Sequence, residues 1–255
     1  MKCVQPVNRI IPFTDVANHN RVDFFFNFIY SLVLPRIKRG VLTALLLCSS
    51  LAYAQQNDTA YQRVISERTA RIVNTLDITD AAVREKVQAQ IAEQYISLNA
   101  IHDGSKATVT AIKAKTIAKE DIAAEVKTEE EGKTAKLQEL HKQFIAKLKT
   151  TLTEAQIEKV KDGMTYRILP VTWTAYMDML QKLTPEQKEK MYGWLVEARE
   201  LAMDEGSSDK KHAVFGKYKG RINNYLSAAG YDMKKEGEEW AKRIQAAKDA
   251  KQNSN

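Results

Sequence analysis

The sequence has few cysteines, few histidines and no long apolar run. These shortages argue against disulfides, histidine-rich metal sites and membrane-spanning helices. Only two of its 255 residues are cysteines, Cys3 and Cys48, and both lie in a segment that we expect to be removed. The remaining chain then has no disulfide and no thiol nucleophile, even in an oxidising compartment. Its clearest apolar run, residues 41–50, is shorter than the ~20 residues of a membrane span. We therefore expect no stable membrane anchor.

Enzyme signatures are equally scarce. After residue 54 the chain holds three histidines, His102, His141 and His212, without the close spacing of a metal-ligand pair. No Gly-x-Ser-x-Gly elbow is present, and the glycines of residues 216–220 have the wrong spacing for a P-loop. We expect no metal and no cofactor. The sequence does not exclude a hydrolase or lyase that uses two carboxylates, because such a pair has no characteristic spacing in the sequence.

The N-terminal segment has the pattern of an export signal. Basic residues at 36–39 precede the apolar run, and Ala52-Tyr53-Ala54 matches the small-x-small pattern of a cleavage site. We expect cleavage near Ala54 and a periplasmic or secreted protein. Residues 1–35 exceed the usual length of such a signal, so we interpret them as an extension from an upstream start codon.

Removal of residues 1–54 also removes most of the basic excess. Six of the 39 basic residues and two of the 32 acidic residues lie there, which leaves 33 against 30 and a net charge of +3 in place of +7. A nucleic-acid-binding domain is usually strongly basic. The sequence therefore predicts no nucleic-acid partner.

Helical periodicity dominates residues 55–255 and predicts a single all-α domain, a helical bundle. Residues 55–165 read as charged helical hairpins and residues 166–250 as an aromatic-rich helical part. Glu129-Glu130-Glu131-Gly132 predicts a turn between two helices, because glycine costs a helix ~1 kcal/mol relative to alanine. An extended crossing is predicted at 166–172, since Pro170 disfavours a helical conformation before it. The expected helices span residues 59–75, 80–101, 172–181, 185–203 and 209–229, the last closed by Gly230.

Two segments 31 residues apart share the pattern Leu-Thr-x-x-Gln. In each, Thr153 or Thr184 is the expected N-cap and the glutamine three positions later completes a capping box. Pro185 suits the first helical position. The same pattern recurs in small periplasmic helical chaperones and stress sensors of Gram-negative bacteria, which residues 141–159 resemble.

The helix expected at 185–203 carries a carboxylate group beside its buried stripe. Met191, Leu195, Ala198 and Ala202 form that stripe, and Glu197, Glu200 and Asp204 share the adjoining face. Such a group is typical of an acid/base pair or a cation site. The alternative is that the carboxylates pair with lysines or face water.

The next helix contains two interior glycines, Gly216 and Gly220, in one row with His212 and Asn223. Two interior glycines cost a helix ~2 kcal/mol together. We therefore expect that a structural or binding role requires the absence of side chains at these two positions. Close approach of another helix, a bound ligand and a break in the helix are the three interpretations. The expected ligand contacts are His212, Gly216, Tyr218, Lys219, Gly220, Arg221 and Asn223. The catalytic candidates of an enzyme would be Glu197, Glu200 and His212.

A set of motifs in this C-terminal part resembles one family. They are Pro170-Val171-Thr172, Glu197-Ala198-Arg199-Glu200, Ala202-Met203-Asp204, Phe215 to Leu226 and Gly230-Tyr231-Asp232. Together they are similar to an uncharacterised family of exported Bacteroidota proteins, a domain of unknown function often encoded in polysaccharide-utilisation loci. The resemblance implies a periplasmic setting and a carbohydrate context, but no activity and no site residues.

Aromatic residues are concentrated in the same part. Residues 166–240 contain ten, whereas residues 55–165 contain Tyr61, Tyr95 and Phe144. Aromatic faces such as Trp173, Tyr176 or Tyr218 can stack on sugar rings. We therefore expect non-catalytic binding of an oligosaccharide or uronate. The alternatives are a carbohydrate-active enzyme and a chaperone-like scaffold.

Overall fold

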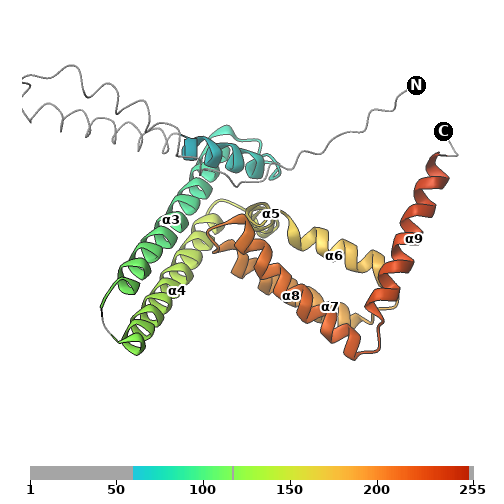
Figure 1. Cartoon of the computed structure of the whole chain (residues 1–255). Helices are drawn as coiled ribbons and strands as arrows, with labels where there is room; N and C mark the ends of the chain where they lie inside the picture. The colour runs from blue at the N-terminus through green and yellow to red at the C-terminus, as the bar shows by residue number, and fades with distance from the viewer. Residues whose placement is uncertain (1–59, 117, 253–255) are drawn as a thin grey trace, which may run out of the picture. The chain divides into compact units, whose positions relative to one another are not determined.

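The computed structural model describes residues 60–116 and 118–252, and every element in this part is helical. A first helix occupies residues 60–73. The helices labelled in Figure 1 are α3 (Ala81–Lys113), α4 (Lys119–Lys149), α5 (Glu154–Met164), α6 (Ile168–Met179), α7 (Pro185–Met203), α8 (Ser208–Ala228) and α9 (Met233–Gln252). The predicted all-α fold is confirmed. The expected signal segment, residues 1–54, lies outside the described residues.

The charged hairpin differs from its prediction. α3 continues through Gly104 to Lys113 and α4 runs unbroken through Gly132, so the turn lies between Lys113 and Lys119 rather than at 129–132. Neither glycine meets a neighbour that would contact a Cβ. The two helices pack along one another (Figure 1), and this packing outweighs a propensity cost of ~1 kcal/mol per glycine.

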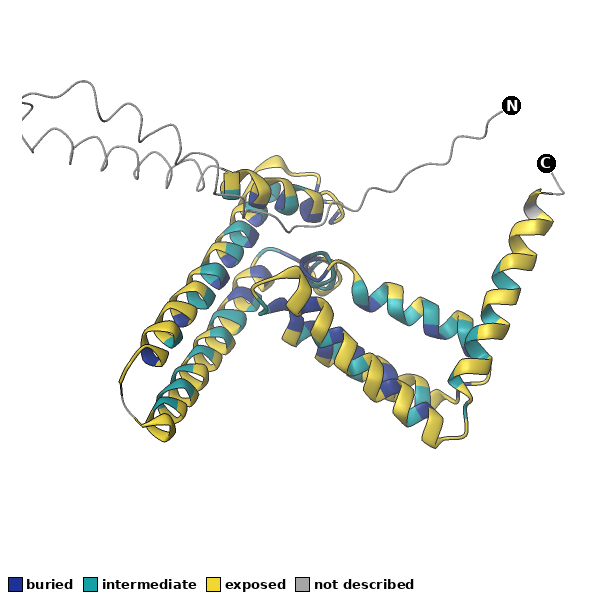
Figure 2. Ribbon diagram, viewed as in Figure 1, coloured by how far each residue is buried: buried dark blue, intermediate teal, exposed yellow. Residues whose placement is uncertain are grey.

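Buried apolar side chains form two clusters, which we call the first core and the second core. Figure 2 shows buried residues gathered where α7 faces α8 and sparse toward the turn between α3 and α4. The first core draws on the N-terminal helix, α3, α4 and α5, and it includes Ile72, Leu76, Ile91, Phe144, Leu148, Ile157, Met164 and, from α7, Met203. The second core draws on α6, α7 and α8, and it includes Leu169, Tyr176, Met191, Leu195, Phe215, Ile222 and Leu226.

Both predicted capping boxes are present. The Thr153 hydroxyl accepts a hydrogen bond from the Gln156 backbone N–H, and the Gln156 side chain accepts one from the Thr153 N–H. Thr184 and Gln187 repeat this arrangement, with Pro185 at the first helical position. The Gln156 amide also donates to the Leu76 carbonyl at 2.9 Å. The motif therefore caps α5 and ties it to the segment before α3.

The predicted extended crossing at 166–172 is wrong. α6 begins at Ile168, so Pro170 lies within its first turn, where a missing N–H removes no helical hydrogen bond. The chain changes direction one step earlier, because Tyr166 and Arg167 both have a φ of 57°, in the left-handed region. The Arg167 N–H donates to the Asp162 carbonyl at 2.7 Å and fixes this corner.

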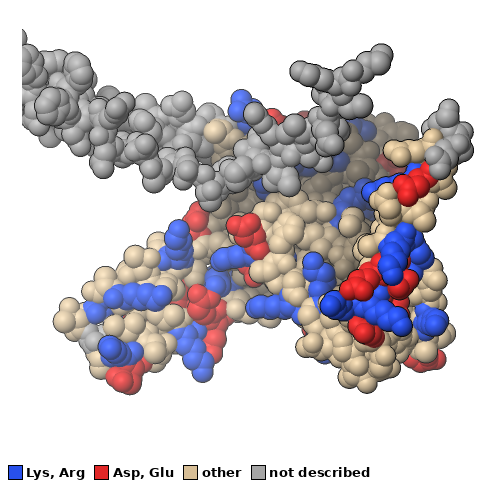
Figure 3. Space-filling view, turned by 45° about the vertical axis from the view of Figure 1, so that its right-hand side comes forward, with Lys and Arg blue, Asp and Glu red and all other residues tan. Residues whose placement is uncertain are grey.

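Charges of both signs are interspersed over the face of the molecule shown in Figure 3. Many belong to exposed pairs, such as Lys147 with Glu93 at 2.9 Å and Lys115 with Glu125 at 2.5 Å. None of the helices that the structure describes is long and apolar enough to cross a membrane.

Candidate functional site

The glycine row of α8 faces open space. A Cβ at Gly216 or Gly220 would meet nothing within 4 Å, and His212 and Asn223 are exposed. α8 is continuous from Ser208 to Ala228, with Gly230 beyond it at a φ of 92°. Neither the close approach of another helix nor a break in α8 therefore explains the glycines among the described residues. A ligand on this row stays a prediction.

The predicted ligand contacts do not form one site, because they lie on two different faces of α8. Asn223 accepts a hydrogen bond from the Tyr176 hydroxyl at 2.8 Å. On another face of α8, Arg221 lies 4.4 Å from the centroid of the Trp194 ring and 6.0 Å from that of Tyr218. Arg221 also pairs with Glu197 at 3.6 Å. Arg221 therefore already contacts two aromatic rings and one carboxylate of the protein itself. The remaining candidate, Lys219, is exposed.

Two of the predicted stacking rings belong to the second core. Tyr176 is 6% exposed, and its hydroxyl is held by Asn223. Trp173 packs partly buried against the second core and meets the edge of the Tyr192 ring, with centroids 5.1 Å apart. Their positions favour a packing role, because the i, i+3 spacing that puts Trp173 and Tyr176 on one face directs that face inward.

The predicted carboxylate group is also divided. Glu197 pairs with Arg221, whereas Glu200 and Asp204 flank His141 of α4. His141 Nδ1 lies 2.9 Å from Asp204 Oδ1, and Nε2 lies 3.3 Å from Glu200 Oε2. The hydrogen bond with Asp204 and that with Glu200 raise the pKa of His141 to about 9, against a smaller opposing effect of burial.

Glu200 remains ionised in this arrangement. Burial alone would raise its pKa, but the hydrogen bond with His141 and the charge of Lys161, 3.2 Å away, lower that pKa to about 2. A general acid needs a pKa near the working pH. Glu200 is therefore unsuited to donate a proton at neutral pH, and its contacts correspond to the structural alternative, pairing with cations.

A buried arginine, which the sequence pattern did not single out, joins α5 to α7. Arg199 is 2% exposed and donates to Asp162 at 2.9 Å, to Glu158 and, at 3.3 Å, to Glu200. Removing these carboxylates would leave a buried guanidinium group with fewer compensating charges, which is destabilising. Arg199 lies next to Ala198 on the buried face of α7. A helical wheel that considers only apolar residues does not identify it as buried.

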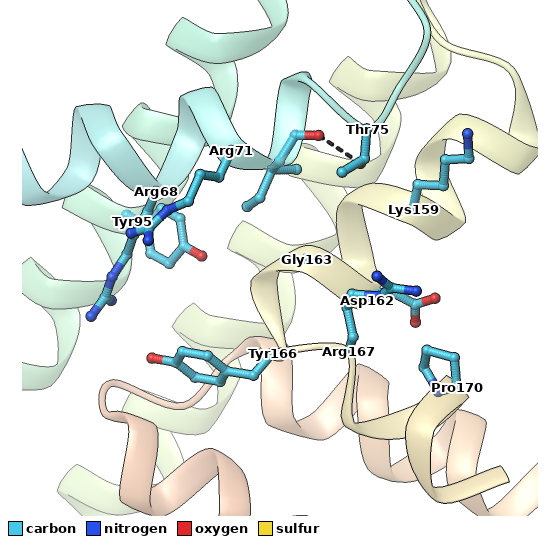
Figure 4. Close-up of a pocket in the computed structure, with 11 residues that line it drawn as sticks. Arg68, Arg71, Thr75, Tyr95, Lys159, Asp162, Gly163, Tyr166, Arg167 and Pro170 are labelled. Atoms are coloured by element: carbon cyan, nitrogen blue, oxygen red, sulfur yellow. Dashed lines mark hydrogen bonds between the residues drawn. The ribbon is translucent and has the colours of Figure 1, made fainter. Parts of the chain in front are cut away.

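A hollow among the described residues lies at the corner between α5 and α6 (Figure 4). Its volume is about 760 Å³. Its walls come from the N-terminal helix, α3, α5 and the start of α6. The lining residues are Arg68, Arg71, Ile72, Thr75, Tyr95, Lys159, Asp162, Gly163, Tyr166, Arg167 and Pro170. We call this hollow the arginine pocket.

Two backbone features shape the arginine pocket. The left-handed conformation of Tyr166 and Arg167 turns both residues toward its rim, a conformation that is uncommon away from glycine. On the opposite wall, a Cβ at Gly163 would lie 2.7 Å from Ile72 Cγ1. The absence of a side chain at Gly163 thus lets the N-terminal helix approach α5 and brings Arg68 and Arg71 to the pocket.

The charge of the pocket is strongly positive. Four of its lining residues are cations and one, Asp162, is an acid. Lys159 pairs with Asp77 at 2.7 Å, and Asp162 pairs with Arg199. Arg68, Arg71 and Arg167 have no ion pair with any described residue, although all three line the same hollow.

Two tyrosines complete the arginine pocket. Tyr95 is partly buried, burial raises the pKa of its hydroxyl, and this hydroxyl points into the pocket. It has no hydrogen-bond partner among the residues that the structure describes. Tyr166 is 41% exposed at the rim. His212 lies against the Tyr166 ring, with ring centroids 5.5 Å apart, but does not itself line the pocket.

The sequence offered only faint signals for this site. Arg68 and Arg71 have the i, i+3 spacing of one helix face, and Tyr166-Arg167 precedes a proline. Three arginines from segments about 100 residues apart show no common pattern until the fold brings them together. A second hollow of about 560 Å³ between α4, α7 and α8 holds Tyr218 and Asp204 with lysines and acids in mixture.

Comparison with known proteins identifies the chain only at the level of a family. A family model with the description "Protein of unknown function (DUF3826)" matches residues 62–246, which include every residue of the arginine pocket. No curated protein matches the chain.

Proposed function

The chain belongs to the DUF3826 family of proteins of unknown function, and we propose that it is an exported, non-catalytic protein that binds glycan-derived ligands in the arginine pocket. The observation that carries this proposal is the set of three arginines without ion-pair partners among the described residues, around a hollow of about 760 Å³. The expected setting in polysaccharide utilisation supplies the carbohydrate class.

The pocket has the composition of a sugar-binding site. Tyr166 offers an exposed aromatic face on which a pyranose ring can stack. Arg68, Arg71 and Arg167 supply forked N–H groups that match carboxylates and vicinal hydroxyls. Its volume falls within the usual range of small-molecule sites, ~300–1,000 Å³. A chaperone surface would instead be expected to be broad and apolar, and this hollow is charged.

Binding without catalysis fits the carboxylates better than an enzyme does. Glu197 pairs with Arg221, and Glu200 is held ionised by His141 and Lys161. Asp162, the acid in the pocket, accepts a hydrogen bond from buried Arg199. Among the described residues, no pair of free carboxylates flanks the pocket, as a carboxylate-dependent hydrolase would require.

Titration calorimetry against a panel of acidic and neutral trisaccharides tests the proposal. We expect at least one to bind more tightly than millimolar, and Arg71→Gln to weaken that binding by about 10- to 100-fold, the effect of a lost charge-assisted hydrogen bond. Arg63→Gln is the matched control, because Arg63 is an exposed residue of the same helix outside the pocket. Absence of binding across the panel would refute the proposal.

A further inference from the structure

We propose that the ligand of the arginine pocket is an acidic sugar recognised through its anionic group, a carboxylate or a sulfate ester. This inference rests on the proposed function and narrows its ligand class. It follows from the inventory of hydrogen-bond donors and acceptors that the pocket presents.

Positively charged donors dominate one side of the pocket. Arg68, Arg71 and Arg167 can only donate hydrogen bonds, and they have no ion pair with any described residue. The Tyr95 hydroxyl, which points into the pocket, can also donate. The Thr75 hydroxyl already donates to the Ile72 carbonyl at 2.7 Å, so it can only accept from a ligand. An anionic group that accepts hydrogen bonds from the guanidinium groups therefore suits this pocket better than a neutral hydroxyl does.

A charged acceptor lies on the α5 side of the pocket. Asp162 Oδ1 accepts the hydrogen bond from Arg199 at 2.9 Å, which leaves Oδ2 for a further donor. Figure 4 shows this carboxylate on the α5 side and the Tyr95 hydroxyl on the side of Arg68 and Arg71. A sugar acid can use both sides, with its anionic group at Arg68 and Arg71 and one ring hydroxyl donating to Asp162.

His212 acts as a positioning residue in this arrangement. Its ring packs against Tyr166, and its Nδ1 lies 2.8 Å from the Ser208 carbonyl, which fixes the imidazole on α8. Tyr166 is thereby supported where a sugar ring would stack. The contribution of His212 to binding is expected through Tyr166 rather than through direct contact with the sugar.

The test compares matched ligands by titration calorimetry at pH 7 on the full chain. The probes are trigalacturonic acid, its fully methyl-esterified form and a sulfated neutral trisaccharide. We expect the acid or the sulfate ester to bind about tenfold or more tightly than the methyl ester, and Arg71→Gln to abolish that difference. Arg63→Gln should retain it. The two anionic probes decide between carboxylate and sulfate.

The outcomes separate this inference from the proposed function. Equal binding of the acid and its methyl ester would overturn the inference and leave sugar binding intact. Retention of the preference in Arg71→Gln would overturn the placement of the oxyanion. Failure of all three probes and of the neutral panel would overturn both. For His212, His212→Phe should preserve the acid preference and His212→Ala should weaken all sugars alike, because only the former keeps a ring behind Tyr166.

Discussion

The pair of carboxylates around His141 makes this side chain a source of pH-dependent stability. Its pKa in the folded protein, about 9, lies above the value of ~6.5 expected in the unfolded chain. The folded state therefore binds the proton more tightly, and the stabilisation is fully present below pH 6.5. It is lost as the pH rises toward 9.

We expect the free energy of unfolding to fall by an amount of the order of 2 kcal/mol between pH 6.5 and 9 because of His141. His141→Gln should flatten this slope in urea titrations, and Lys142→Gln, the neighbouring exposed cation, should not. Lys211 opposes the trend above pH 8, since burial lowers its pKa to about 8. The difference between wild-type and variant curves isolates His141, and parallel curves would contradict its role.

Single residues were predictable from sequence where one helix decides their position. The buried stripe of Met191, Leu195, Ala198 and Ala202 is confirmed, because 3.6-residue periodicity alone places it. Arg199 and the pocket arginines were not found, because their role depends on segments that the fold brings together. His212 was singled out for a ligand, whereas its ring contact is with Tyr166.

Among the helices, close approach occurs at Gly163 and not at the glycine row of α8. A Cβ at Gly163 would press on Ile72 of the N-terminal helix, whereas a Cβ at Gly216 would meet nothing. The two interior glycines of α8 indicated helix packing at Gly216 as one interpretation. A lone glycine near the end of α5 carries no such pattern, although its packing role is the clearer one.

These two glycines should respond oppositely to alanine. Gly163→Ala is expected to destabilise the protein by about 1–3 kcal/mol through overpacking. Gly216→Ala should stabilise it by about 0.5–1 kcal/mol, since alanine has the higher helix propensity and enters open space. Urea unfolding of both variants measures the difference. A destabilised Gly216→Ala protein would show that something packs on that face after all.

Helix boundaries were predictable where local chemistry marks them. The starts of α5 and α7 follow from Thr153, Thr184 and Pro185, and Gly230 follows α8 as expected. The turn of the hairpin was misplaced because Gly132 was given more weight than the packing of α3 on α4. The corner at Tyr166 was misplaced because it depends on a left-handed backbone at two non-glycine residues.

At the scale of the whole molecule, the two cores are joined by shared residues. Met203 of α7 belongs to the first core, and Arg199 of the same helix binds Asp162 and Glu158 of α5. The arginine pocket lies where α5 gives way to α6, at the junction between the cores. This coupling predicts one cooperative unit rather than two independent halves.

Unfolding of the two cores is therefore expected to coincide. All three tryptophans, Trp173, Trp194 and Trp240, follow residue 166, so their fluorescence reports on the second core and α9. Far-UV circular dichroism reports on every helix. In urea, both signals should give the same midpoint within experimental error. A tryptophan transition displaced from the dichroism transition would show that the cores unfold separately.

The choice of glutamine at the third position of α5 has a consequence for the Leu-Thr-x-x-Gln motif. A glutamate would serve the cap of Thr153 equally well, but a carboxylate cannot donate to the Leu76 carbonyl. The Gln156 amide makes two different hydrogen bonds. Its oxygen accepts one from the Thr153 N–H, and its nitrogen donates one to the Leu76 carbonyl, 80 residues earlier in the chain. A motif that the sequence indicates only as a local helix cap therefore also makes a long-range hydrogen bond.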